Sequence, residues 1–179
     1  MRPWCLTVAY DASNVVVRAR LPPDAPTERG CAVEFHRGNG KIVYDPFRGG
    51  MKNKTRGWCV VEVDREITRY FRWWMGYEKH IHLRQPSWDA HISVVRGERL
   101  QSDVQHLWKK YNGKRVDFLY QHVCEYSVGD DGDGGQFYIV EVECPLLNTI
   151  RDELKLRTGW KFHLTFGRTY EYEARRPKR

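Results

Sequence analysis

Hydrophobic and polar positions alternate along several stretches of the chain, and a period of two is typical of β-strands with one buried face. Residues 58–64 begin with a continuous apolar run typical of a buried strand, longer strands are predicted at 115–128 and 136–143, and shorter ones at 31–35 and 41–45. The segment 36–40 between the two short stretches contains two glycines, so we expect a hairpin turn there. The glycine-rich acidic segment 129–135 predicts a second hairpin.

Apolar positions recur at helical spacing in three other segments, 64–76, 102–113 and 145–159. Asp64 and Ser102 are suitable N-caps for the first two segments, and Pro145 is tolerated at the start of the third. The expected apolar faces are Ile67, Tyr70, Phe71 and Trp74; Val104, Leu107, Trp108 and Tyr111; and Leu147, Ile150 and Leu154.

Two predicted strands, WDAHISVVRG at 88–97 and WKFHLTFGR at 160–168, each carry a histidine two residues before a hydroxyl residue. The pairs are His91 with Ser93 and His163 with Thr165. Side chains at i and i+2 share one face of a strand, so each strand presents an imidazole beside a hydroxyl. If the fold brings these strands together, the two pairs form a phosphate-sized site.

The two histidine strands belong to an internal repeat. VVEVDREITRYF at 60–71 and IVEVECPLLNTI at 139–150 share a strand, an acidic turn and a helix start in the same order, and each then leads to a histidine strand. Internal duplication accounts for this order. We therefore predict an α+β fold with duplicated β-α-β lobes whose antiparallel sheets surround a central cleft.

The repeat also predicts the domain organisation. We expect one bilobal domain over 1–179, with a β-rich N-terminal addition at 1–57, the lobe with the first histidine motif at 58–114 and the second lobe at 115–179. Equivalent strands of two related lobes commonly meet near the axis between them. His91 and His163 would then face each other across the cleft.

Composition and charge restrict the possible functions. The net charge of +7 over 179 residues favours a polyanionic ligand, and no apolar run reaches the roughly 20 residues of a membrane span. The N-terminal segment lacks the apolar core of a signal peptide. Five cysteines without CxxC spacing argue against a disulfide framework or a zinc site, so we expect a cytoplasmic protein.

The chain resembles the 2H phosphoesterases over about 58–168. The signature of that family is two H-x-[ST]-x-hydrophobic motifs in duplicated lobes, and here the motifs are 91–94 and 163–166. The differences are a serine in the first motif and a long loop before it. The compact single chain looks similar to phage-type members, which include anti-CBASS phosphodiesterases that destroy cyclic oligonucleotide signals.

The resemblance implies metal-independent hydrolysis of a phosphodiester bond without a cofactor. By resemblance, His163 is the general base and His91 the general acid, while Ser93 and Thr165 bind the non-bridging phosphate oxygens. Histidine suits these roles because its ordinary pKa lies near neutrality. The expected ligand is a nucleotide, a cyclic oligonucleotide or an RNA end, with no membrane and no obligate protein partner.

Other side chains are candidates to bind the substrate. Arg96 and Arg168 follow the two motifs and Lys161 precedes the second, so they can supply positive charge to phosphates. Aromatic side chains can stack on a base, and Glu171 can accept a hydrogen bond from a base amino group. The stacking candidates are Trp160, Trp88, Trp73, Tyr170 and Tyr10.

Three alternatives remain open at this point. Other branches of the family act on RNA 2′,3′-cyclic phosphates or on 2′,5′-linked ends. A non-catalytic RNA- or nucleotide-binding module would keep the fold and the positive charge. A metal hydrolase could use His80, His82 and His91, although no third ligand follows at a usual spacing.

Overall fold

A computed structural model of the protein describes residues 35–47, 55–128 and 136–169, with the backbone alone described over 122–128. The elements follow one another as β1 (Phe35–Tyr44), β2 (Trp58–Val63), α1 (Arg65–Glu78), β3 (His91–Arg96), the 3-10 helix η1 (Ser102–Leu107), β4 (Arg115–Val128), β5 (Gln136–Glu143), α2 (Pro145–Glu153) and β6 (Phe162–Thr169).

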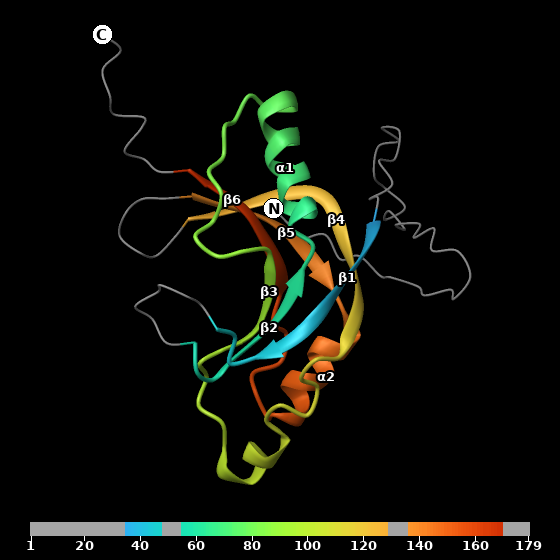
Figure 1. The fold of residues 1–179 in the computed structure, drawn as a ribbon, viewed down its shortest axis with the longest axis vertical. Coiled ribbons are helices and arrows are strands. Elements are labelled where there is room, and N and C mark those ends of the chain that lie inside the picture. The colour runs from blue at the N-terminus through green and yellow to red at the C-terminus, as the bar shows by residue number, and fades with distance from the viewer. Residues whose placement is uncertain (1–34, 48–54, 129–135, 170–179) are drawn as a thin grey trace, which may run out of the picture.

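The described strands form a closed antiparallel barrel in the order β1-β2-β3-β6-β5-β4 (Figure 1). Each predicted lobe contributes a strand–helix–strand unit to this barrel, β2-α1-β3 and β5-α2-β6. The two units meet where β3 pairs with β6. β1 closes the barrel on the other side, because it pairs with both β2 and β4. The duplication of the lobes stays a prediction.

One apolar core joins the barrel and both helices. Val61, Ile92, Leu164 and Val140 lie on four adjacent strands and are fully buried. α1 packs against β6 and α2 packs against β3, so each helix contacts the histidine strand of the other unit. Figure 1 shows α1 and α2 at opposite ends of the barrel. None of the helices among the described residues is long and apolar enough to cross a membrane.

The predicted start of α1 is confirmed, because the Asp64 carboxylate accepts a hydrogen bond from the Glu66 amide at 2.9 Å. The helix continues two residues beyond Gly76 to Glu78. Its inward face is rotated slightly from the predicted stripe, since Thr68, Phe71 and Met75 are buried while Tyr70 is 46% exposed. α2 starts at Pro145 as predicted. It ends at Glu153, well before Gly159, and Lys155 just after it takes a positive φ of 52°.

Two predicted elements are wrong. The segment 36–40 lies inside the continuous strand β1 and forms no hairpin turn. Gly40 is required there for close packing, because a Cβ on it would lie 2.6 Å from the Glu62 carbonyl oxygen and 2.5 Å from Val61 Cγ1. The helix expected from Ser102 is only the six-residue η1, since Lys109 adopts a φ of 72° and the chain turns there.

Candidate functional site

The candidate site lies where β3 and β6 pair. Ile92 is opposite Leu164 in this antiparallel pair, and both side chains are fully buried. Continuing the register by one residue in each direction places His91 opposite Thr165 and Ser93 opposite His163. These four side chains share the other face of the two strands, and each is partly exposed. We call this surface the histidine face.

The register places the two histidines diagonally across the strand pair. Directly opposite residues have Cβ atoms roughly 5 Å apart, and diagonal neighbours lie roughly 7–8 Å apart. A phosphate group fits between two imidazoles at that spacing. Each histidine then has its own hydroxyl residue two positions along the strand and the other hydroxyl residue directly across from it.

Both imidazoles are oriented by the same local contact. His91 Nδ1 lies 2.7 Å from the Asp89 carbonyl oxygen, and His163 Nδ1 lies 3.3 Å from the Lys161 carbonyl oxygen. A carbonyl oxygen can only accept, so Nδ1 carries the hydrogen in each ring. In the neutral ring Nε2 is then the nitrogen that can accept a proton.

The environment of His163 favours its neutral form. Burial lowers the pKa of His163, and the positive charge of Arg96 acts in the same direction. The hydrogen bond to the Lys161 carbonyl and the charge of Glu141 oppose this effect without overcoming it. A neutral His163 can take a proton at neutral pH, which supports the role of general base.

His91 has a different environment. Its ring lies against that of Trp88 in a tilted arrangement, with the centroids 3.9 Å apart and an interplanar angle of 31°. Trp88 in turn lies 5.6 Å from the ring of Trp58. An aromatic surface therefore covers one side of His91 and fixes the plane of its ring.

A glutamate lies beside each histidine on the neighbouring strand. Glu62 of β2 is opposite His91, and Glu141 of β5 is opposite His163. The sequence repeat aligns these two glutamates, in VVEV and IVEV. Glu141 also forms an ion pair with Lys161 at 3.1 Å. Sequence reasoning missed both glutamates as site residues, although the repeat contained the signal that could have found them.

Two β-bulges bring Arg96 and Arg168 to the histidine face. In β3, Val95 pairs with Cys59 and Ser93 pairs with the next residue of β2, so Val94 is an extra residue without a partner position. Phe166 is the extra residue of β6 in the same way, between Thr165 and Gly167. Each arginine follows its histidine by five positions, which in a regular strand would place it on the opposite face. The extra residue reverses the alternation.

The burial pattern agrees with these bulges. Val94 and Val95 are both fully buried, and so is Phe166, whose neighbour Gly167 is buried as well. Arg96 then lies opposite Trp58, 5.5 Å from the centroid of its ring. The corresponding pair in the second unit is Arg168 opposite Phe137, at 5.0 Å.

Two cavities lie beside the two histidine strands, one lined by His91 and the other by the residues just before His163. The first has a volume of about 570 Å³ and its lining includes Glu62, Trp88 and His91; we call it the His91-side cavity. The second has about 310 Å³ and its lining includes Glu141, Trp160 and Lys161; we call it the Lys161-side cavity. The sequence repeat aligns Glu62 with Glu141, and the histidine motifs align Trp88 with Trp160.

The remaining predicted site residues lie in several places. The Lys161 side chain is 84% exposed and Trp160 packs against Arg151, whose guanidinium lies 4.5 Å from its ring. Trp73 is 59% exposed on α1 and stacks on Tyr77. The structure therefore places Trp73 within an aromatic group on that helix. Three predicted binding residues lie outside the described residues: Tyr10, Tyr170 and Glu171.

The residues proposed for a metal site do not gather in the part of the chain that the structure describes. No three histidine, cysteine, aspartate or glutamate side chains there form a group that could hold a metal ion, and this includes His80, His82 and His91. Comparison of the chain with protein-family models, with curated proteins and with solved structures finds no match.

Proposed function

We propose that this protein is a metal-independent phosphodiesterase that hydrolyses a nucleotide phosphodiester bond. The observation that carries this proposal is the crossed arrangement on β3 and β6, where each histidine lies beside one hydroxyl residue and opposite the other. Two imidazoles can supply both the base and the acid of a phosphoryl transfer. The resemblance to the 2H phosphoesterases points to the same chemistry.

In the proposed reaction, His163 is neutral and its Nε2 takes a proton from the attacking oxygen of water or of a ribose 2′-hydroxyl. A bond forms between that oxygen and phosphorus while the bond from phosphorus to the departing ribose oxygen breaks. His91, protonated at Nε2, gives its proton to the departing oxygen. The lowered pKa of His163 supports this assignment of the base.

The other groups on the histidine face stabilise the phosphate. The hydroxyls of Ser93 and Thr165 donate hydrogen bonds to the non-bridging oxygens, where negative charge increases in the transition state. Arg96 and Arg168 add positive charge from the two ends of the strand pair. No part of this mechanism requires a metal ion, because the imidazoles move the protons and the arginines balance the charge.

Among nucleotide diesters, we propose cyclic oligonucleotides as the substrate and the cytoplasm as the site of action. The two cavities support a substrate with a nucleoside on each side of the reacting phosphate. An RNA 2′,3′-cyclic phosphate is the second candidate. It carries one nucleoside at the reacting phosphate, and the larger His91-side cavity has room for that nucleoside by itself.

The test is an assay with EDTA present and a panel of 2′,3′-cyclic nucleotides, 2′,5′-linked oligoadenylate and 3′,5′-linked cyclic di- and trinucleotides. We expect turnover of at least one member. His91→Ala and His163→Ala should each lower kcat by roughly 10²–10⁴-fold, the usual contribution of a general acid or base. His106→Ala is the matched control, since His106 is an exposed residue of η1.

Three outcomes would contradict the proposal. Loss of all turnover with EDTA would show that a metal ion carries the reaction. Full activity in either histidine variant would remove the two-histidine mechanism. Tight binding of a panel member without turnover would instead support the non-catalytic binding module.

A further inference from the structure

Two helix arginines occupy the same position in the sequence repeat. Arg72 follows the segment 60–71 in α1, and Arg151 follows the aligned segment 139–150 in α2. Phe71 and Ile150, the residues just before them, are both buried in the core. The two arginines therefore leave their helices from matching points beside the core.

Both arginines bind the carbonyl oxygen of a bulged residue. Arg72 Nη1 donates to the Phe166 carbonyl oxygen at 2.8 Å, and Arg151 Nη1 donates to the Val94 carbonyl oxygen at 2.6 Å. Val94 and Phe166 are the extra residues of the bulges in β3 and β6. The residue at a bulge falls out of the ladder of hydrogen bonds, and a buried carbonyl without a partner is costly. A guanidinium supplies a strong charge-assisted bond at that point.

The two contacts are crossed between the repeated units. Arg72 belongs to the unit with β3, but it holds β6; Arg151 belongs to the unit with β6, but it holds β3. This follows from the packing of the helices, since α1 lies against β6 and α2 against β3. Each histidine strand is therefore held by a side chain from the other half of the chain.

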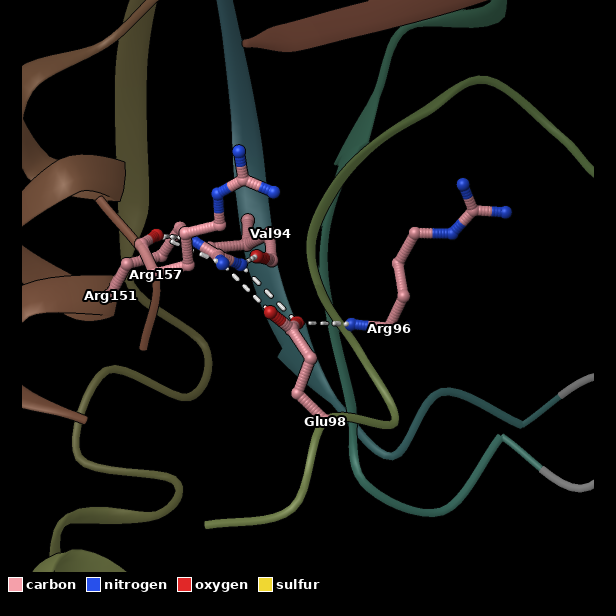
Figure 2. Close-up of polar contacts among 5 residues, drawn as sticks. All are labelled: Val94, Arg96, Glu98, Arg151 and Arg157. Carbon is pink, nitrogen blue, oxygen red and sulfur yellow. Dashed lines mark hydrogen bonds and ion pairs between the residues drawn. The ribbon is translucent and has the colours of Figure 1, made fainter. Parts of the chain in front are cut away.

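The contacts of Arg151 are especially extensive (Figure 2). Its side chain is 1% exposed and forms a bidentate ion pair with Glu98, with the shorter contact at 2.7 Å. Nε and Nη2 also donate to the Arg157 carbonyl oxygen. With the bond to Val94, these contacts use all five N–H groups of the guanidinium. Arg151 therefore has no donor left for a ligand.

Glu98 extends the contact to Arg96. Glu98 Oε2 accepts a hydrogen bond from the Arg96 amide at 3.1 Å, so Arg151 fixes the backbone at Val94 directly and at Arg96 through Glu98. Figure 2 shows the Arg96 side chain pointing away from this ion pair. The position that corresponds to Glu98 in the second unit is 170, which lies outside the described residues.

We propose that Arg72 and Arg151 are positioning residues, which hold the two bulges and so keep Arg168 and Arg96, respectively, on the histidine face. The consequence for catalysis rests on the function proposed above. The arrangement makes each half of the site depend on a helix of the other half. It predicts a crossed pattern, in which Arg151 acts through Arg96 and Arg72 acts through Arg168.

The first test measures kcat/KM with a cleaved panel member for Arg151→Gln, Arg72→Gln, Arg96→Ala and Arg168→Ala, and for the four double variants. We expect Arg151→Gln to have little further effect in the Arg96→Ala background and its full effect in the Arg168→Ala background. Arg72→Gln should show the opposite pattern. Arg72→Lys should restore part of the activity, because an ammonium can make the one bond to the Phe166 carbonyl.

The second test needs no substrate. The charge of Arg96 is one of the causes that lower the pKa of His163, together with burial and against the Lys161 carbonyl and Glu141. An NMR titration of the His163 ring should show its pKa raised in Arg151→Gln and in Arg96→Ala, with no further rise in the double variant. In Arg72→Gln the pKa of His163 should stay at the wild-type value.

Matched controls separate this effect from general damage to the fold. Arg157→Gln keeps the backbone carbonyl that Arg151 binds, and Arg69→Gln removes an exposed arginine one turn from Arg72. Both should behave as the wild type. If the buried Arg151→Gln variant does not fold, the double variant Arg151→Met/Glu98→Gln replaces it, because this pair of changes removes the bond to Val94 without leaving the Glu98 carboxylate unpaired.

The proposal is overturned if each helix variant adds its full effect in both the Arg96→Ala and the Arg168→Ala background. A wild-type pKa of His163 in folded Arg151→Gln, or in the folded double variant, would also overturn it. The wild-type protein can also cleave no panel member while the pKa of His163 is raised in Arg151→Gln. That result would reject the proposed function and support the positioning role.

Discussion

At the scale of single residues, the two histidines receive the same hydrogen bond and different surroundings. Each donates from Nδ1 to the carbonyl oxygen two residues earlier in its own strand. His91 then lies against Trp88, whereas His163 is influenced by Glu141 across the strand and by Arg96. Pairs of titratable groups in different environments are how one site provides a base and an acid at the same pH.

Opposite changes in the pKa of His163 should follow from removing the two neighbouring charges. Burial is the main cause that lowers this pKa, and Arg96 adds to it, whereas Glu141 raises it. We expect Arg96→Gln to raise the pKa of His163 and Glu141→Gln to lower it, each measured by NMR titration of the ring. The acidic limb of the pH–rate profile should move in the same directions.

The sign of the effect on stability can be worked out as well. The pKa of His163 is lower in the folded protein than the ordinary value of about 6.5 that applies to the unfolded chain. Its contribution to stability is therefore complete above that value and is lost as the pH falls through the folded pKa.

A shift of the acidic limb of the pH–rate profile in the same direction for Arg96→Gln and Glu141→Gln would contradict this account of the site.

At the scale of elements, the hydrophobic pattern predicted most strands and helices but not their irregularities. The histidine strands, the long strands β4 and β5 and the capped start of α1 follow from periodicity and capping, which are local properties; the predicted turn at 129–135 lies outside the described residues. The bulges at Val94 and Phe166 depend on how strands pair across the barrel. Sequence reasoning therefore placed Arg96 and Arg168 near the site without showing how residues at an odd spacing reach the histidine face.

The glycines of β1 show the same limit. Gly38-Asn39-Gly40 resembles a turn, because glycine is the usual residue where a chain reverses. In the barrel the reason for both glycines is lack of space: a Cβ on Gly38 would lie 2.5 Å from the Phe118 ring, and one on Gly40 would meet the backbone of Glu62. Close approach between strands leaves no signal in one sequence that distinguishes it from a turn.

Gly40→Ala should destabilise the barrel. The new Cβ would lie 2.6 Å from the Glu62 carbonyl oxygen and 2.5 Å from Val61 Cγ1, so the β1–β2 pair must move apart. Overpacking of this kind costs about 1–3 kcal/mol. Chemical denaturation should show this loss, and Gly159→Ala is a useful comparison because its Cβ would meet no atom within 4 Å. Its φ of 71° still adds a smaller strain cost.

At the scale of the whole molecule, the order of strands in the barrel creates the candidate site. The prediction that the two histidine strands lie close together agrees with the pairing of β3 with β6. The closure of the barrel through β1 could not be predicted, because β1 pairs with β2 and β4, which lie in different halves of the sequence. The crossed contacts of α1 and α2 depend on the same global arrangement.

This arrangement places a cavity beside each histidine strand, and the two cavities predict the form of the substrate. A diester with a nucleoside on each side of the phosphate can place one base in the His91-side cavity and the other in the Lys161-side cavity. Stacking of a base on an aromatic side chain contributes roughly 1–3 kcal/mol, and about 1.4 kcal/mol is a factor of ten. We therefore expect kcat/KM to be at least about tenfold higher for a two-nucleoside diester than for a nucleoside 2′,3′-cyclic phosphate.

Variants of Trp88 provide the sharper form of this prediction, because its ring lines the His91-side cavity and contacts His91. Trp88→Ala should lower kcat/KM by about tenfold or more if a base stacks there, and Trp88→Phe should retain most of the activity. Tyr77→Ala serves as the control, because it removes an exposed aromatic ring of α1 that lines neither cavity. Equal kcat/KM for the two kinds of substrate would show that only one nucleoside is bound, and would favour the 2′,3′-cyclic phosphate as the substrate.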